Sequence, residues 1–327
     1  MTKPTISLVA LSIAVAVSTL VGAQAAIFPI YEVPRCDYPN LRDGTLEDWE
    51  HLVPGPSLTQ DDFSPALLIN GLDDGGIDPA DLAYRIFFAW HSKTQTIWIG
   101  VERVDDVYIN TYQGGDPRSM SMSDGLELML DGDHSGGDYN AFPVADYGEE
   151  MVKLLTGYQA QQYSMVPETP DGMWVGSNTA AAGWVTHLPW ADGYGSVSGG
   201  APTTTIMEGY FTPWDALDWH GPDVSIRSTL TAGRVIGFQV SMPDWDVVGT
   251  LHAFYTISGL ANTWRMADNF VGGELVGCDG DDCGPGPMAI QVYPPECVDC
   301  RPAPWPEECG ASAIQSESWG RIKAGLR

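Results

Sequence analysis

The sequence predicts an all-β protein: an antiparallel, jelly-roll-like β-sandwich with a disulfide-tied C-terminal extension. Short apolar runs, rich in β-branched and aromatic residues, recur between Gly, Pro, Asn and Asp. The 327 residues include 37 Gly, 24 Pro, 12 Trp and 13 Tyr, which suits strands and tight turns better than a helical bundle. Five of the six cysteines lie within the last fifty residues, which indicates a cross-linked end.

The expected strands follow one another through the middle of the chain, with few helix signals between them. The apolar runs lie at 84–90, 96–101, 126–130, 235–242 and 251–257. Residues 145–162 are the one tolerable helix candidate, and residues 167–206 predict a long hairpin or loop excursion. We therefore expect a single sandwich domain over residues 35–277, followed by a Cys/Pro-rich extension with a short basic tail over 278–327.

The N-terminus predicts a secretory signal peptide over residues 1–25. Lys3 precedes an apolar run at 6–21, and the small-residue site Ala23-Gln24-Ala25 follows it. An uncleaved anchor helix is the alternative, because the run is nearly long enough to span a bilayer. No later stretch approaches the ~20 apolar residues of a membrane span. We expect a secreted protein, extracellular or periplasmic, with no membrane insertion after cleavage.

The cysteine count agrees with export, since disulfides persist in oxidising compartments. The sequence predicts three disulfides, with Cys36 paired to one of the C-terminal cysteines so that the two ends come together. The alternative is a zinc ion held by Cys283, Cys297, Cys300 and Cys309, of which Cys297 and Cys300 have the x2 spacing of zinc ligands. The six cysteines are Cys36, Cys278, Cys283, Cys297, Cys300 and Cys309.

The charge balance excludes two classes of partner. The chain has 43 Asp and Glu against 15 Lys and Arg, a formal net charge of -28. So few cations could not neutralise the phosphates of a nucleic acid. The same excess argues against binding to anionic membrane surfaces. Neutral ligands and cations remain as candidate partners.

Six short segments resemble a known family. They are DGTLEDW at 43–49, WHSKTQTIWIGVERVDD at 90–106, SDGLELMLDGD at 123–133, EGYFTPW at 208–214, VIGFQVSMPDWD at 235–246, and WR at 264–265 with FVGGEL at 270–275. Their order resembles that of family 9 carbohydrate-binding modules, a β-sandwich group related to DOMON domains. The resemblance implies a non-catalytic module that binds a glycan or polysaccharide and carries structural calcium.

Aromatic residues are the candidate sugar platforms, because a flat ring suits the apolar C–H face of a sugar. We expect Trp264, Arg265, Trp190 and Tyr112 to contact carbohydrate, and Trp264 and Arg265 lie in the closing segment of the resemblance. The segments at the family's two Trp clamp positions, 118–123 and 256–263, contain no aromatic residue. A surface or structural module that has lost its sugar site is therefore an alternative.

The acidic run that starts at Asp131 predicts a calcium site. Asp131, Asp133 and Ser135 place oxygens at positions 1, 3 and 5 of a loop, with Gly136 at position 6 and Asp138 just beyond. Calcium takes six to eight oxygen ligands on a tightly turned backbone. The loop is not an EF-hand, since Phe142 stands where the twelfth-position Glu would be.

Two further kinds of chemistry are weaker alternatives. Paired carboxylates could serve a glycosidase, but in so acidic a chain they arise by chance, and the resemblance places several at strand ends, where they make backbone hydrogen bonds or bind calcium. DOMON relatives include b-type haem binders, for which Met120 or Met122 with His252 could supply ligands. We expect no enzyme activity. The carboxylates concerned are Asp43, Asp105, Asp106, Asp124, Glu127, Asp244 and Asp246.

Overall fold

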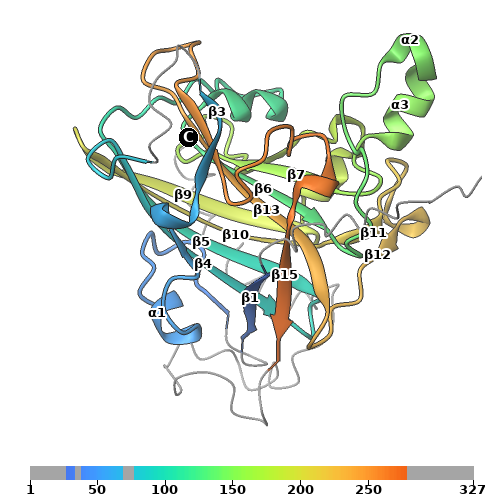
Figure 1. The fold of residues 1–327 in the computed structure, drawn as a ribbon, viewed down its shortest axis with the longest axis horizontal. Coiled ribbons are helices and arrows are strands. Elements are labelled where there is room, and N and C mark those ends of the chain that lie inside the picture. The colour runs from blue at the N-terminus through green and yellow to red at the C-terminus, as the bar shows by residue number, and fades with distance from the viewer. Residues whose placement is uncertain (1–26, 34–37, 69–76, 278–327) are drawn as a thin grey trace, which may run out of the picture.

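The computed structural model describes residues 27–33, 38–68 and 77–277, and these form a mostly β structure with few helices (Figure 1). The predicted signal peptide, the C-terminal extension and all six cysteines lie outside the described residues. The disulfides and the boundaries of the extension therefore stay predictions. No helix among the described residues is long and apolar enough to cross a membrane.

Thirteen strands form one mixed sheet that folds into two layers. Its main path runs β8-β7-β6-β13-β15-β1-β4-β5-β10-β9, and a separate ribbon of two strands, β11 and β12, lies beside it. The predicted runs at 84–90, 96–101, 126–130 and 235–242 all fall inside strands, and that at 251–257 contains one. The strands are β1 (Ile27–Glu32), β2 (Leu58–Thr59), β3 (Ser64–Leu68), β4 (Leu82–His91), β5 (Thr96–Asp105), β6 (Leu126–Asp131), β7 (Gln161–Met165), β8 (Val175–Ser177), β9 (Ala191–Gly199), β10 (Thr203–Phe211), β11 (Trp214–Ala216), β12 (Ile226–Arg227), β13 (Val235–Asp244), β14 (Ala253–Thr256) and β15 (Val271–Val276).

Most strand pairs are antiparallel, as predicted, but β1 is an exception. It pairs in parallel with β15 on one side and with β4 on the other, so Tyr31 lies opposite both Val276 and Ala89. The sheet is thus mixed rather than purely antiparallel, because the N-terminal strand bridges the two layers. The hairpin predicted at 167–206 is confirmed in part: β9 pairs antiparallel along its length with β10 and continues the sheet.

The interior lies between the β4-β5-β10-β9 layer and the β7-β6-β13-β15 layer. Phe88 of β4 and Phe238 of β13 meet edge to face, with ring centroids 4.6 Å apart, and neither is exposed. Leu128, Val240 and Ile99 pack in the same apolar cluster. This facing of apolar side chains from two layers is the arrangement that defines a β-sandwich.

The outer face of the β4-β5-β10 layer is buried as well. The segment that includes α1 (Trp49–Leu52) packs Trp49 and Leu52 against Phe87, Ala89 and Trp98. Since inward and outward residues of β4 are both covered, its sequence reads as a nearly continuous apolar run rather than an alternating one.

A second cover lies over β6. Met129 points away from the main core and packs with Tyr139, Ala160, Ala267 and Phe270. The region that predicted a helix at 145–162 forms two short ones, because Gly148 adopts a positive φ of 78° between them. The helices are α2 (Val144–Tyr147) and α3 (Glu149–Leu155), with 3₁₀ turns η1 (Gln60–Asp62), η2 (Pro117–Met122), η3 (Ala180–Thr186), η4 (Pro222–Val224) and η5 (Ala267–Asn269).

Candidate functional site

Among the described residues, we consider two places that combine groups able to bind a ligand. One is a carboxylate cluster at the end of the sandwich where β4 and β14 begin and β5 and β13 end. We define it as Asp81, Asp106, Asp244, Asp246 and His252. The other is a pocket beside η2 and α3, described below.

Arg103 forms the buried base of the carboxylate cluster. Its side chain is not exposed at all, and its Nη2 lies 2.5 Å from Asp105 Oδ2 and 2.9 Å from Asp124 Oδ1. Its Nη1 donates to the Pro243 carbonyl at 2.6 Å. Asp244 Oδ1 lies farther away, 3.7 Å from Nη2. One guanidinium therefore faces three buried carboxylates, which leaves negative charge in excess.

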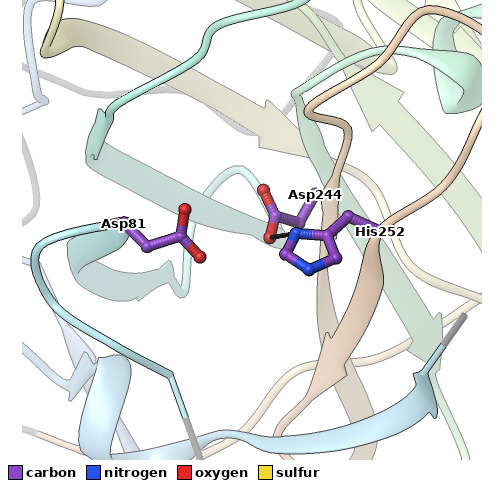
Figure 2. Close-up of side chains that lie close together, drawn as sticks. All are labelled: Asp81, Asp244 and His252. Atoms are coloured by element: carbon purple, nitrogen blue, oxygen red, sulfur yellow. Dashed lines mark ion pairs between the residues drawn. The ribbon is translucent and has the colours of Figure 1, made fainter. Parts of the chain in front are cut away.

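The other members of the carboxylate cluster face Asp244 from neighbouring strand ends. Figure 2 shows Asp81, Asp244 and His252 pointing toward one another. Ligand atoms of these three lie within 4.8 Å of one another, and the same holds for Asp81, Asp106 and Asp246. His252 Nδ1 lies 2.5 Å from Asp246 Oδ2 and 3.3 Å from Asp244 Oδ2. Asp81 therefore belongs to both groups: one consists of carboxylates alone, and the other includes the imidazole of His252.

Asp244 is the member whose environment is least satisfied. It is 1% exposed, yet neither of its carboxylate oxygens accepts a hydrogen bond within the described residues. Burial, followed by the charges of Asp81 and nearby carboxylates, raises its pKa to about 7 despite Arg103. Burial and the charges of Asp246 and Asp106 raise the pKa of Asp81 to about 6. A buried carboxylate without donors is costly unless a cation neutralises it.

Asp81 was not among the residues singled out from the sequence, although a signal was present. In the β4–β5 hairpin His91 pairs with Thr96 and Leu82 with Asp105. One step further outward, the Asp106 amide donates to the Asp81 carbonyl at 3.0 Å. If the pairing of the two strands is counted outward from the hairpin turn, Asp81 falls beside Asp105 and Asp106, at the end of β5.

The predicted calcium loop forms a hydrogen-bonded turn. The unexposed Asp131 accepts from the amides of Gly136 at 2.8 Å and Ser135 at 3.3 Å, and Asp133 accepts from Ser135 at 3.1 Å. Asp138 lies further along and forms a bridge with Met266. Of the groups of three or more His, Cys, Asp or Glu that converge in the described residues, none includes these aspartates. Calcium at this loop stays a prediction.

The pocket is a shallow depression, widely open to solvent, with a volume of about 360 Å³. Its walls come from η2, the loop after β6, α3 and the segment between β8 and η3. Together they offer a guanidinium, an ammonium, two amides, a hydroxyl and one aromatic ring. The lining residues are Arg118, Asn140, Ala141, Phe142, Val152, Lys153, Thr156, Asn178 and Ala181.

Trp264, one of the predicted sugar platforms, lies next to the pocket. Asn140 Nδ2 donates to the Trp264 carbonyl at 3.3 Å, and the preceding Tyr139 pairs through its amide with the Arg265 carbonyl at 2.9 Å. The Trp264 side chain is 40% exposed, and the Arg265 guanidinium carbon lies 5.9 Å from its ring centroid. The structure thus brings Trp264 and Arg265 together with a wall of the pocket.

The other two predicted platforms have different surroundings. Trp190 is half-buried, with its ring 5.9 Å from that of Trp184 and 5.2 Å from that of Trp214, and Arg227 lies over it. Tyr112 is 2% exposed, and its hydroxyl donates to Asp171 at 2.8 Å. Expecting Tyr112 to stack on a sugar was wrong in this structure, because protein covers its ring.

The remaining sequence candidates are held in structural contacts. Glu127 is buried on β6, Asp124 accepts from the amides of Ile109 and Trp245, and Asp43 accepts from the amide of Thr45. Met120, weighed as a haem ligand, packs in an apolar cluster with Tyr112 and Val166, whereas His252 lies among carboxylates. The structure therefore gives Met120 and His252 different surroundings.

Comparison with known proteins gives structural neighbours only. No protein-family model and no curated protein matches the chain. A family 9 carbohydrate-binding module from Caldicellulosiruptor kristjanssonii, in complex with cellotriose, is similar at 11% identity with a TM-score of 0.48, over 82% of this chain and all of that one. A structure of such a module from the same organism with glucose is similar at 12% identity and a TM-score of 0.46, over 77% and 97%. At these values the likeness carries no argument about a ligand, so function must be argued from the two sites.

Proposed function

We propose that this protein is a non-catalytic carbohydrate-binding protein whose ligand lies in the pocket between η2, α3 and the loop after β6. The observation that carries the proposal is the composition of that pocket: amides of Asn140 and Asn178, cationic donors of Arg118 and Lys153, and the ring of Phe142 in about 360 Å³. A sugar presents hydroxyls around its edge and C–H groups on its faces, so it needs both kinds of contact.

The surface beside the pocket extends the same chemistry. Trp264 is exposed and connected to the pocket wall through Asn140. An oligosaccharide that places one sugar in the pocket could stack a second one on this ring. Such an arrangement would bind an oligosaccharide through many weak contacts. The residues that line the pocket include no Asp or Glu that could act as general acid or base.

Export is part of the proposal. The N-terminal sequence, with Lys3, an apolar run and Ala23-Gln24-Ala25, supports a secretory signal. A glycan-binding protein placed outside the cytoplasm would meet polysaccharides directly. N-terminal sequencing of the protein recovered from culture medium or periplasm tests this, with a mature start at Ala26 expected.

The proposal also includes a calcium ion, held at the carboxylate cluster. The residues there fit a hard cation, because Asp81, Asp106 and Asp246 converge and Asp244 has two buried oxygens without hydrogen-bond donors. The cluster joins the ends of β4, β5 and β13 to the start of β14. A cation there would stabilise the fold by neutralising the carboxylates that Arg103 leaves uncompensated.

A glycan array tests the sugar function, followed by calorimetric titration of the best oligosaccharide. Asn178→Ala should weaken binding roughly fivefold, because a buried sugar hydroxyl loses a hydrogen-bond partner worth about 1 kcal/mol. Lys93→Gln, which changes a residue outside the pocket lining, is the control and should bind normally. An array without any bound glycan would contradict the proposal and favour a structural module.

Thermal melting in calcium and in EDTA tests the cation. Asp106→Asn should lower the melting temperature in calcium, because the ion loses a ligand, but not in EDTA, where the charge of the exposed Asp106 only repels Asp81. Asp133→Asn is the matched control, since Asp133 is an exposed aspartate of the Asp131 loop. If Asp133→Asn abolishes the calcium effect and Asp106→Asn does not, the ion lies in the loop. If calcium stabilises neither variant nor the parent, calcium is absent from the protein.

A further inference from the structure

The residues that line the pocket include cations but no carboxylates, unlike the chain as a whole. The chain carries 43 acidic and 15 basic residues. Of the nine residues that line the pocket, two are basic, Arg118 and Lys153, and none is acidic. The pocket wall therefore holds two of the few cations of the chain.

Arg118 and Lys153 each form an ion pair with a neighbouring carboxylate, and each keeps N–H donors that these hydrogen bonds do not use. Arg118 gives Nε and Nη2 to Asp116, at 2.9 and 2.6 Å, while its Nη1 takes no part in those bonds. Lys153 Nζ donates to Glu150 Oε1 at 2.7 Å and lies 5.3 Å from the Trp219 ring centroid. An ammonium has three N–H donors, so further bonds remain available.

Both ion pairs are exposed to solvent. The side chains of Arg118 and Asp116 are 57% and 51% exposed, and those of Lys153 and Glu150 are 41% and 74% exposed. Exposed pairs gain little energy in water. An anionic ligand group could therefore share these cations without breaking a strong internal interaction, while Asp116 and Glu150 keep the two side chains directed.

We propose that the pocket selects an acidic sugar, one that carries a carboxylate or a sulfate ester, over a neutral one. This proposal rests on the proposed carbohydrate function and names the ligand class of the same site. The anionic group lies between Arg118 and Lys153, where charge-assisted hydrogen bonds form. The amides of Asn140 and Asn178 and the ring of Phe142 then contact the hydroxyls and the C–H face that neutral sugars also have.

The test is calorimetric titration of the full chain with three sets of oligosaccharides of equal length: uronic-acid oligomers, sulfated oligomers and their neutral counterparts. We expect an acidic set to bind at least about tenfold more tightly than the neutral set. Lys153→Gln and Arg118→Gln should each weaken acidic binding roughly fivefold and neutral binding less, so that the preference for the acidic set falls, because each variant removes one exposed charge. Lys93→Gln is the charge-matched control outside the pocket and should change neither.

The outcomes separate the two proposals. Tighter binding of the uronic acids identifies the carboxylate as the recognised group, and tighter binding of the sulfated set identifies the sulfate. Equal binding of acidic and neutral sets, unaffected by Lys153→Gln, overturns the acidic-sugar inference and leaves carbohydrate binding intact. If none of the three sets binds, both proposals fail together.

Discussion

At the scale of single residues, Arg103 determines how the sandwich accommodates carboxylates in its interior. The guanidinium forms ion pairs with Asp105 and Asp124 and donates to the backbone of β13 at Pro243. Burial nevertheless raises the pKa of Asp124 to about 7, with Arg103 acting in the opposite direction. The arginine therefore compensates a desolvation cost that the carboxylates create.

Replacing Arg103 should be strongly destabilising. Arg103→Met would leave buried carboxylates without a partner and should reduce the free energy of unfolding by about 3–5 kcal/mol. Arg85→Met is the control, because Arg85 makes half-exposed pairs with Glu50 and Glu102 and should cost no more than about 1 kcal/mol. Urea denaturation measures both. Equal losses for the two variants would show that the Arg103 pairs are not special.

Glu208 is a second buried acid, and it connects two of the segments singled out in the sequence. Trp49 Nε1 donates to Glu208 Oε1 at 2.8 Å, while the other carboxylate oxygen has no partner in the described residues. Burial raises the pKa of Glu208 to about 9 and outweighs the opposing hydrogen bond from Trp49. The side chain is therefore protonated in the folded protein at neutral pH.

This protonation makes stability depend on pH in a defined direction. The contribution of neutral Glu208 is fully present below the unfolded pKa near 4.5 and is lost as pH rises through about 9. The free energy of unfolding should fall between pH 5 and 9 by up to about 1.4 kcal/mol per pH unit. Glu208→Gln keeps the acceptor for Trp49 and should flatten this slope. A slope identical to that of the parent would mean that Glu208 is ionised in the fold.

At the scale of elements, one glycine fixes how α1 docks on the sheet. A Cβ at Gly100 of β5 would lie 2.6 Å from Trp49 Cε2, closer than real contacts allow. Because Gly100 has no side chain, the indole can lie flat on β5 and reach Glu208 on β10. The apolar run at 96–101 predicts a strand, but the contact of Gly100 with Trp49 could not be predicted from local pattern.

Gly100→Ala should therefore displace Trp49 and destabilise the protein by about 1–3 kcal/mol through overpacking. Gly183→Ala is the control, since a Cβ there meets nothing within 4 Å and should change stability little. The melting temperature of each variant measures the effect. A neutral Gly100→Ala would indicate that α1 does not lie against β5 as described.

The strands and the carboxylate cluster differ in how far local sequence determines them. Strand positions follow from apolar runs bounded by turn residues, and Trp98 and Trp214, which lie in such strands, are 3% and 1% exposed. Asp106, Asp244 and Asp246 were singled out as strand-end carboxylates. They lie close to Asp81 and His252 only because particular strand ends meet in space. Predicting this would require the order of the strands in the layers as well as their register.

At the scale of the whole molecule, the sequence predicted a two-layer β architecture but not the strand that joins the layers. β1 pairs in parallel with both β4 and β15, a non-local choice that no local motif encodes. The pocket was missed for the same reason. Asn140, Lys153 and Asn178 come from three separate segments, and only their packing over β6 and beside η2 makes them a site.

The most direct test of the account is a crystal structure of the mature protein with the oligosaccharide that binds best. The account predicts a sugar ring in the pocket, in contact with Asn140, Phe142 and Asn178, with an anionic group between Arg118 and Lys153. A sugar bound elsewhere on the protein, with the pocket free of ligand in the same crystal, would contradict it.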